Sequence, residues 1–149
     1  MQRDRLARPM LLAAAAFTVA GGYVHLREWL DTYRDVPSSA PGSWLVRIGF
    51  PVDAGLSVVA AVVLVLAATR LPKLTVPATV ATLLFQAGSL AFLIGSRTGT
   101  VLGWTEPTWT PGAEQSRALE LAAMAALVVA VALRRLAPNP SRAGRPVPA

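Results

Sequence analysis

The sequence contains no cysteine, only one histidine and one lysine, and few charged residues overall. The absence of cysteine excludes disulfides, thiolate metal sites and cysteine nucleophiles. Charged residues make up 15% of the 149 residues, whereas hydrophobic residues make up 54%. Leu, Val and Ala occur in long uninterrupted runs that a soluble domain of this size could not bury. The length therefore allows one domain, and the composition places that domain in a membrane.

Four segments are apolar enough to cross a bilayer, which requires about 20 mostly apolar residues in a helix. They cover residues 9–29, 48–69, 74–95 and 114–136. A proline lies in or just before each predicted first turn, where a missing N–H costs least: Pro9, Pro51, Pro77 and Pro111. The sequence predicts an all-α bundle of four transmembrane helices within residues 1–137, followed by a disordered cytoplasmic tail at 138–149.

The distribution of basic residues predicts which end of the bundle faces the cytoplasm. One end carries nine of them: Arg3, Arg5, Arg8, Arg70, Lys73, Arg134, Arg135, Arg142 and Arg145. The opposite end carries five, together with seven of the eight acids and all four tryptophans. Both termini are therefore predicted to be cytoplasmic, and the tryptophans are predicted to form an aromatic belt at the outer surface.

The predicted location is a bacterial plasma membrane, with the lipid bilayer as partner and other membrane proteins or a second copy as further candidates. The net charge of +6 does not predict nucleic-acid binding, because the basic residues follow the helix ends and not one folded face. An alternative treats the N-terminus as a signal peptide cleaved after Ala20. The apolar stretch continues past that site, which favours four spans.

Small residues at four-residue intervals predict where the helices approach one another, because close backbone contact replaces hydrophobic burial in lipid. The residues expected at helix contacts are Gly22, Gly49, Ser57, Ala91 and Gly95.

Ionisable residues inside the spans form a candidate site, because such groups are costly in a membrane and need partners or water. His25, Asp53 and Glu120 fall roughly 4 to 9 Å below the outer boundary at a rise of 1.5 Å per residue. They come from three spans and can therefore converge. Glu28 shares a helix face with His25, and Arg117 is a candidate partner for the acids. These five residues are the candidate outer-leaflet polar cluster.

Two interpretations of this cluster are open. In the first, His25 is a proton carrier or a metal ligand, with Glu28, Asp53 or Glu120 as a second ligand or base. In the second, which we favour, the groups form ion pairs and hydrogen bonds that fix the register of the helices. A single His-x-x-Glu pair is weak evidence for a metal site. A haem would need an axial ligand opposite His25, and the sequence has no other histidine. No cofactor and no catalytic residue is predicted.

The segment GGYVHLREWLDTYRDVP resembles a group of small four-helix membrane proteins common in actinobacteria. The matching residues are His25, Leu26, Tyr33, Arg34 and Pro37. The resemblance covers about a third of the chain and implies a fold and a membrane location, but no activity. A distant similarity to DoxX-like four-helix proteins concerns the architecture only.

Three functions remain open at this point. The favoured one is a non-catalytic accessory or partner-binding component of a larger membrane assembly. The second is a small redox, metal-handling or proton-handling membrane protein that uses the cluster around His25. The third is an oligomeric transporter, although no inverted repeat is evident between the two halves of the chain.

Overall fold

The computed structural model describes residues 2–136, so the predicted tail at 138–149 lies outside the described residues. In chain order the elements are α1 (Gln2–Glu28), the π-helix η1 (Trp29–Tyr33), α2 (Ser43–Thr69), the 3-10 helix η2 (Pro72–Leu74), α3 (Thr75–Thr98) and α4 (Pro111–Leu136). The four α-helices give segments that are long and apolar enough to cross a membrane, which confirms the predicted fold. Which end faces the cytoplasm stays a prediction.

Two of the four prolines do not lie where their helices start. Pro9 and Pro51 lie inside α1 and α2, because both helices begin several residues before the predicted spans. A proline inside a helix lacks the N–H that would bond the carbonyl four residues earlier. At Pro51 that carbonyl belongs to Arg47, and the indole Nε1 of Trp29 donates a hydrogen bond of 2.9 Å to it. The side chain from η1 therefore compensates for the proline in α2.

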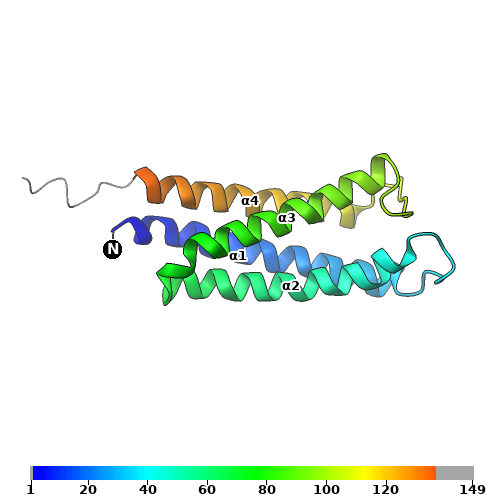
Figure 1. Cartoon of the computed structure of the whole chain (residues 1–149), viewed down its shortest axis with the longest axis horizontal. Helices are drawn as coiled ribbons and strands as arrows, with labels where there is room; N and C mark the ends of the chain where they lie inside the picture. The colour runs from blue at the N-terminus through cyan, green and yellow to red at the C-terminus, as the bar shows by residue number, and fades with distance from the viewer. Residues whose placement is uncertain (1, 137–149) are drawn as a thin grey trace, which may run out of the picture.

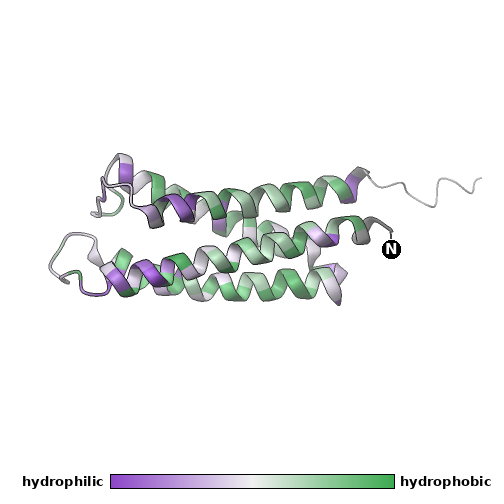
Figure 2. Ribbon diagram, turned by 180° about the vertical axis from the view of Figure 1, so that it is seen from behind, coloured by the Kyte–Doolittle hydropathy of each residue, from purple (hydrophilic) through white to green (hydrophobic). Residues whose placement is uncertain are grey.

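The four helices do not pack equally closely. α1 packs along both α2 and α4, whereas α3 makes fewer contacts with its neighbours α2 and α4 and crosses the bundle obliquely (Figure 1). We call the end with the 70–74 turn and both helix termini Gln2 and Leu136 the terminal end. The opposite end, with the loops 34–42 and 99–110, is the loop end. Figure 2 shows that hydrophilic residues are most frequent toward the loop end, with green hydrophobic ribbon between the two ends.

The hydrophobic core lies toward the terminal end and consists mainly of alanine and leucine. α1, α2 and α4 supply almost all of it, and α3 contributes one residue, Ala78. The buried core residues are Ala7, Leu11, Ala14, Ala15, Ala61, Leu64, Ala67, Ala78, Ala126, Leu127 and Ala130. Because alanine lets helix backbones approach closely, this composition fits tight packing of three helices in lipid.

The five residues expected at helix contacts have different surroundings. A Cβ added at Gly22 would lie 2.5 Å from the Cβ of Ser57, so α1 and α2 approach closely at these two positions. A Cβ at Gly49 would have no neighbour within 4 Å, and Ala91 is exposed. A Cβ at Gly95 would meet a side chain of the following loop, not another helix. The expectation of a helix contact is therefore wrong within this chain for Gly49, Ala91 and Gly95, because Gly49 and Ala91 are exposed and Gly95 faces the following loop.

The two loops at the loop end pack against each other. Val101 and Trp104 exchange two backbone hydrogen bonds of 2.9 Å, and Leu102 and Gly103 between them both have positive φ. Gly42, at φ 68°, lies directly against the backbone of Gly103 and Trp104 and leaves no room for a Cβ. This contact holds the 99–110 loop, and with it the Trp104 ring, over the end of the bundle.

Candidate functional site

Three of the predicted cluster residues meet inside the bundle. His25 Nε2 on α1 lies 3.2 Å from Glu120 Oε1 on α4 and 3.6 Å from Asp53 Oδ1 on α2. Ser89 on α3 donates a hydrogen bond of 2.7 Å to the same Glu120 oxygen. His25 is 8% exposed and Glu120 2% exposed. We call these four residues, one from each α-helix, the acid–histidine cluster.

The acid–histidine cluster contains a contact that depends on a shared proton. The contact between His25 Nε2 and Glu120 Oε1 is a hydrogen bond only if one proton lies between them, on the imidazole or on the carboxyl group. The second oxygen, Glu120 Oε2, is buried and has no hydrogen-bond partner among the described residues. A buried polar atom without a partner is rare and usually contacts water or a ligand. The cluster therefore contains a buried carboxyl oxygen whose hydrogen-bonding capacity is unused among the described residues.

The other two predicted residues lie elsewhere. The Glu28 carboxylate lies against Gly112 in the first turn of α4, where the helix dipole favours negative charge. Arg117 pairs with Glu114, and its guanidinium lies 5.1 Å from the centre of the Trp109 ring. Neither side chain contributes a contact to the acid–histidine cluster. Within residues 2–136, no group of three or more His, Cys, Asp or Glu side chains is arranged to hold a metal ion.

The π-helix η1 turns a tyrosine toward the cluster. The backbone N–H of Arg34 bonds the carbonyl of Trp29 over 2.9 Å, five residues earlier, which widens the turn. In a regular α-helix, Tyr33 would lie about 80° around the axis from His25. The extra residue of a π-turn brings the two to within about 20° of one face. Tyr33 is consequently buried, at 3% exposed.

Aromatic rings form a continuous column from the loop end to the acid–histidine cluster. The rings of Trp104 and Tyr33 lie 6.1 Å apart, and those of Tyr33 and Phe50 stack at 4.6 Å. Phe50 in turn contacts the His25 ring edge-on at 5.2 Å. These separations are typical of favourable aromatic pairs. We call Trp104, Tyr33 and Phe50 the aromatic column.

A cavity of about 190 Å³ lies beside the aromatic column, between α2 and α3. His25, Asp53 and Ser89 line its deep part, and Arg97 and Trp104 line the part nearest the loop end. Apolar and small residues complete its walls: Leu45, Val46, Gly49, Phe92 and Leu93, with Tyr33 and Phe50. The Nε atom of Arg97 is buried and has no hydrogen-bond partner among the described residues. The cavity is thus mainly apolar, with an unpaired donor near one end and titratable groups at the other.

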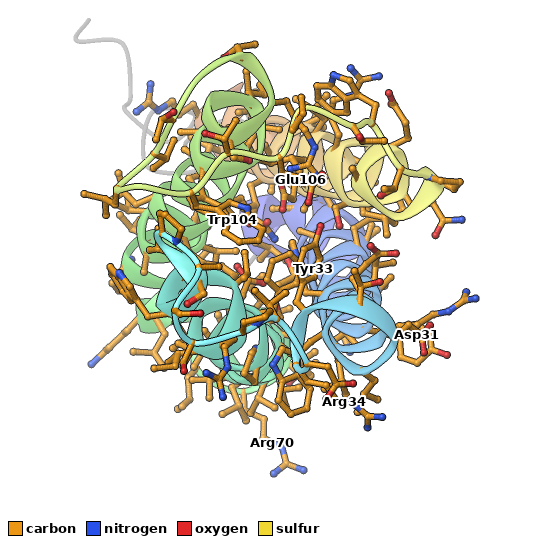
Figure 3. All side chains as sticks on the ribbon, turned by 90° about the vertical axis from the view of Figure 1, so that its right-hand side faces the viewer. Asp31, Tyr33, Arg34, Arg70, Trp104 and Glu106 are labelled. Atoms are coloured by element: carbon orange, nitrogen blue, oxygen red, sulfur yellow. The ribbon has the colours of Figure 1, made fainter. Side chains whose placement is uncertain are left out.

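The loop end closes over this cavity through a tyrosine–glutamate contact. Tyr33 Oη donates to Glu106 Oε2 over 3.4 Å, which joins η1 to the 99–110 loop. Figure 3 shows Tyr33, Trp104 and Glu106 gathered in the centre of the loop end, whereas Asp31 and Arg34 lie toward the outside. The inward side chains therefore form a cover, and the outward ones face the surroundings.

Several residues of this site were not found from the sequence. The resemblance motif gives Tyr33 no role, and the sequence predicts Trp104 only as part of the aromatic belt. Phe50, Ser89 and Arg97 carried no signal, because a polar or aromatic residue near the end of a span is ordinary on its own. Their significance comes from the spatial arrangement of the helices.

Comparison of the chain with protein-family models, curated proteins and solved structures finds no match. The fold therefore indicates no activity by analogy, and a function can be inferred only from the geometry of the site.

Proposed function

We propose that this multi-pass membrane protein binds a small oxygen-bearing ring in the cavity between α2 and α3, and exchanges protons with it through the acid–histidine cluster. The observation that carries this proposal is the cavity itself, which joins apolar and aromatic walls to a deep end containing His25 and Asp53. Mostly apolar pockets with a few convergent polar groups are the usual form of small-molecule sites.

The size and lining of the cavity indicate the class of ligand. A dry protein cavity of about 150 Å³ accommodates a benzene ring. A cavity of about 190 Å³ therefore suits a single substituted ring and not a fused ring system. The aromatic column can stack on its face. Arg97 lines the cavity near the loop end and suits an acceptor oxygen at one end of the ring, and the acid–histidine cluster suits a hydroxyl group at the other.

The proposed setting follows from the charge distribution and the resemblance of the 21–37 segment. The terminal end is placed in the cytoplasm of a bacterium and the loop end outside the plasma membrane. The cavity then lies in the outer half of the bilayer, where a lipophilic ring concentrates. A ligand dissolved in the membrane can reach the cavity between α2 and α3, which pack loosely against each other.

A non-catalytic accessory role is the competing interpretation, and in it the same polar contacts fix helix register. Two observations favour a binding site over it. Register can be fixed by a fully satisfied network, yet Glu120 Oε2 and Arg97 Nε have no hydrogen-bond partners among the described residues. A structural network also does not require the cavity beside it. The third possibility, an oligomeric transporter, has no specific observation in its favour.

Calorimetric titration of the detergent-solubilised protein with 4-methoxyphenol tests the proposal. This probe is one ring with a hydroxyl group at one end and an ether oxygen at the other. We expect saturable binding that Gly49→Leu weakens on the order of tenfold or more, because it adds a large side chain at the wall of the cavity. Gly49 lines the cavity, and a Cβ there meets nothing within 4 Å, so the fold tolerates the change.

Gly55→Leu is the matched control, because Gly55 lies on α2 outside the cavity and its Cβ would also have no neighbour within 4 Å. It should bind the probe as the wild type does. Titrations in two buffers with different ionisation heats should reveal proton exchange on binding, and Glu120→Gln should remove it. Equal affinity in both glycine variants, or no binding by the wild type, would defeat the binding site and leave the accessory role. Identical heats in both buffers would defeat the proton exchange.

A further inference from the structure

The buried face of α3 is polar along most of its length. Its buried or half-buried residues at alternating four- and three-residue intervals are Thr75, Thr79, Thr82, Gln86 and Ser89. We call these five residues the α3 polar stripe. The opposite face of the helix is apolar and exposed, with Val76 at 64% and Leu84 at 70%. α3 therefore presents its polar side to the protein and its apolar side to the lipid.

The inner faces of the other helices are mainly apolar only toward the terminal end. The hydrophobic core there takes ten residues from α1, α2 and α4 and only Ala78 from α3. Ser and Thr are common where membrane helices pack, and their hydroxyl groups then hydrogen-bond across to the neighbouring helix. Polar residues inside a membrane bundle are expensive, and ionisable ones there mark pathways for ions, protons or substrates. A hydroxyl group of the stripe without such a bond therefore requires an explanation beyond packing.

The hydrogen bonds of the stripe run across the bundle or are incomplete. Gln86 donates to Thr18 Oγ1 over 3.0 Å, and Ser89 donates to Glu120 over 2.7 Å. Thr79 Oγ1 is buried and has no hydrogen-bond partner among the described residues.

Two exposed threonines show the usual behaviour in this same chain. Thr69 and Thr98 donate to the carbonyls four residues earlier on their own helices, over 2.7 and 3.0 Å. This local bond satisfies a hydroxyl group in lipid without help from outside the helix. The buried Thr79 hydroxyl has neither this bond nor another partner among the described residues, so its hydrogen-bonding capacity is unused.

Grooves with mainly apolar linings lie on both sides of the stripe. Thr75 and Thr79 line a cavity of about 310 Å³ between α3 and α4 at the terminal end. Thr82 lines another of about 260 Å³ between α2 and α3. Because α3 packs loosely, hydroxyl groups of the stripe lie beside open volume at successive levels of the bundle.

We propose that the α3 polar stripe is a proton pathway that connects the acid–histidine cluster with the terminal end. From Thr75 to Ser89 the stripe rises about 21 Å, and its members are about 4.5 to 6 Å apart along the axis. Single water molecules bridge such gaps, since two successive hydrogen bonds span about 5.6 Å. This line ends at Glu120, which accepts the hydrogen bond of Ser89 and whose Oε2 has no hydrogen-bond partner among the described residues.

Proton movement along this line needs no other reactant. A proton that enters on one water molecule displaces another at the far end, and only O–H and N–H bonds form and break. Together with the cavity toward the loop end, the stripe gives the cluster access to both sides of the membrane. This inference rests on the proposed proton exchange at the cluster and adds the route by which its protons arrive or leave.

Proton flux into proteoliposomes, measured with an internal pH-sensitive dye under a potassium diffusion potential, tests the pathway. We expect wild-type vesicles to acidify faster than empty ones. Thr79→Val should lower this flux on the order of tenfold, because it removes one link at a cost close to one hydrogen bond. Thr79→Val should not impair folding, since the hydroxyl that it removes has no hydrogen-bond partner among the described residues.

Thr69→Val is the matched control, because Thr69 is exposed on α2 and bonds its own helix. It should conduct as the wild type does. The pathway is refuted if wild-type vesicles leak no faster than empty ones, or if Thr79→Val conducts as well as Thr69→Val. Binding of 4-methoxyphenol separates the two proposals: it should persist in Thr79→Val. Flux without probe binding would overturn the ligand site alone, and binding without flux would overturn the pathway alone.

Discussion

The terminal half and the loop half of the bundle are built from the same helices but differ in the residues of their interiors. Toward the terminal end, α1, α2 and α4 meet through alanine and leucine in a dense core. Toward the loop end, the same helices carry a histidine, two acids and an aromatic column around a cavity. Only α3 is polar on its inner face in both halves.

This contrast separates what holds the protein together from what it does. Helices in lipid gain little from hydrophobic burial and depend on close packing of small side chains. The alanine core supplies that packing at one end, which allows the other end to contain a cavity and unpaired polar atoms. The comparison therefore predicts large losses of stability where backbones touch, smaller losses in the acid–histidine cluster and almost none on the outer face of α3.

The largest effect is expected at the closest contact between α1 and α2. Gly22→Leu should lower the free energy of unfolding by about 3 kcal/mol, because its Cβ would overlap Ser57 and crowd the backbone of α2. Thermal unfolding in detergent, followed by circular dichroism, measures the change. Gly55→Leu, where a Cβ meets nothing within 4 Å, is the control. If the two variants melt together, dense helix packing is not what stabilises the bundle.

An intermediate effect is expected at Glu120. Glu120→Leu removes the oxygen that His25 and Ser89 share, and should cost about 2 kcal/mol because both buried groups lose a partner. Glu120→Gln keeps an acceptor oxygen and should cost much less. The difference between the melting temperatures of these two variants measures the polar contribution of the cluster. Equal melting temperatures would mean that the cluster adds nothing to stability.

The sequence was sufficient to predict the spans and the convergence of three ionisable groups. Apolar runs identify membrane helices because backbone polar groups must be satisfied within them. The rise per residue then placed His25, Asp53 and Glu120 at one level. The direction in which each side chain points could not be predicted equally well. Glu28 shares a helical face with His25 by spacing, yet its carboxylate reaches the start of α4 at Gly112.

Two features were harder to predict, for different reasons. The π-turn in η1 changes the helical phase by one residue, so counting along an ideal helix points Tyr33 away from the site. The α3 polar stripe follows a regular three- and four-residue spacing that is visible in the sequence. The small-residue pattern Ala91–Gly95, on a different side of the same helix, competes with the stripe as the predicted inner face.

The smallest effect is expected on that outer side. Ala91→Leu should change the free energy of unfolding by less than about 0.5 kcal/mol, because Ala91 is exposed and a larger apolar side chain only replaces contacts with lipid or detergent. Melting in detergent and the molar mass from light scattering, each compared with Gly22→Leu, provide the measurement. A loss of stability as large as that of Gly22→Leu would place Ala91 at a contact that this single chain does not contain. If the molar mass also fell, that contact would be with a second copy, and the outer face of α3 would belong to the packed part of the molecule.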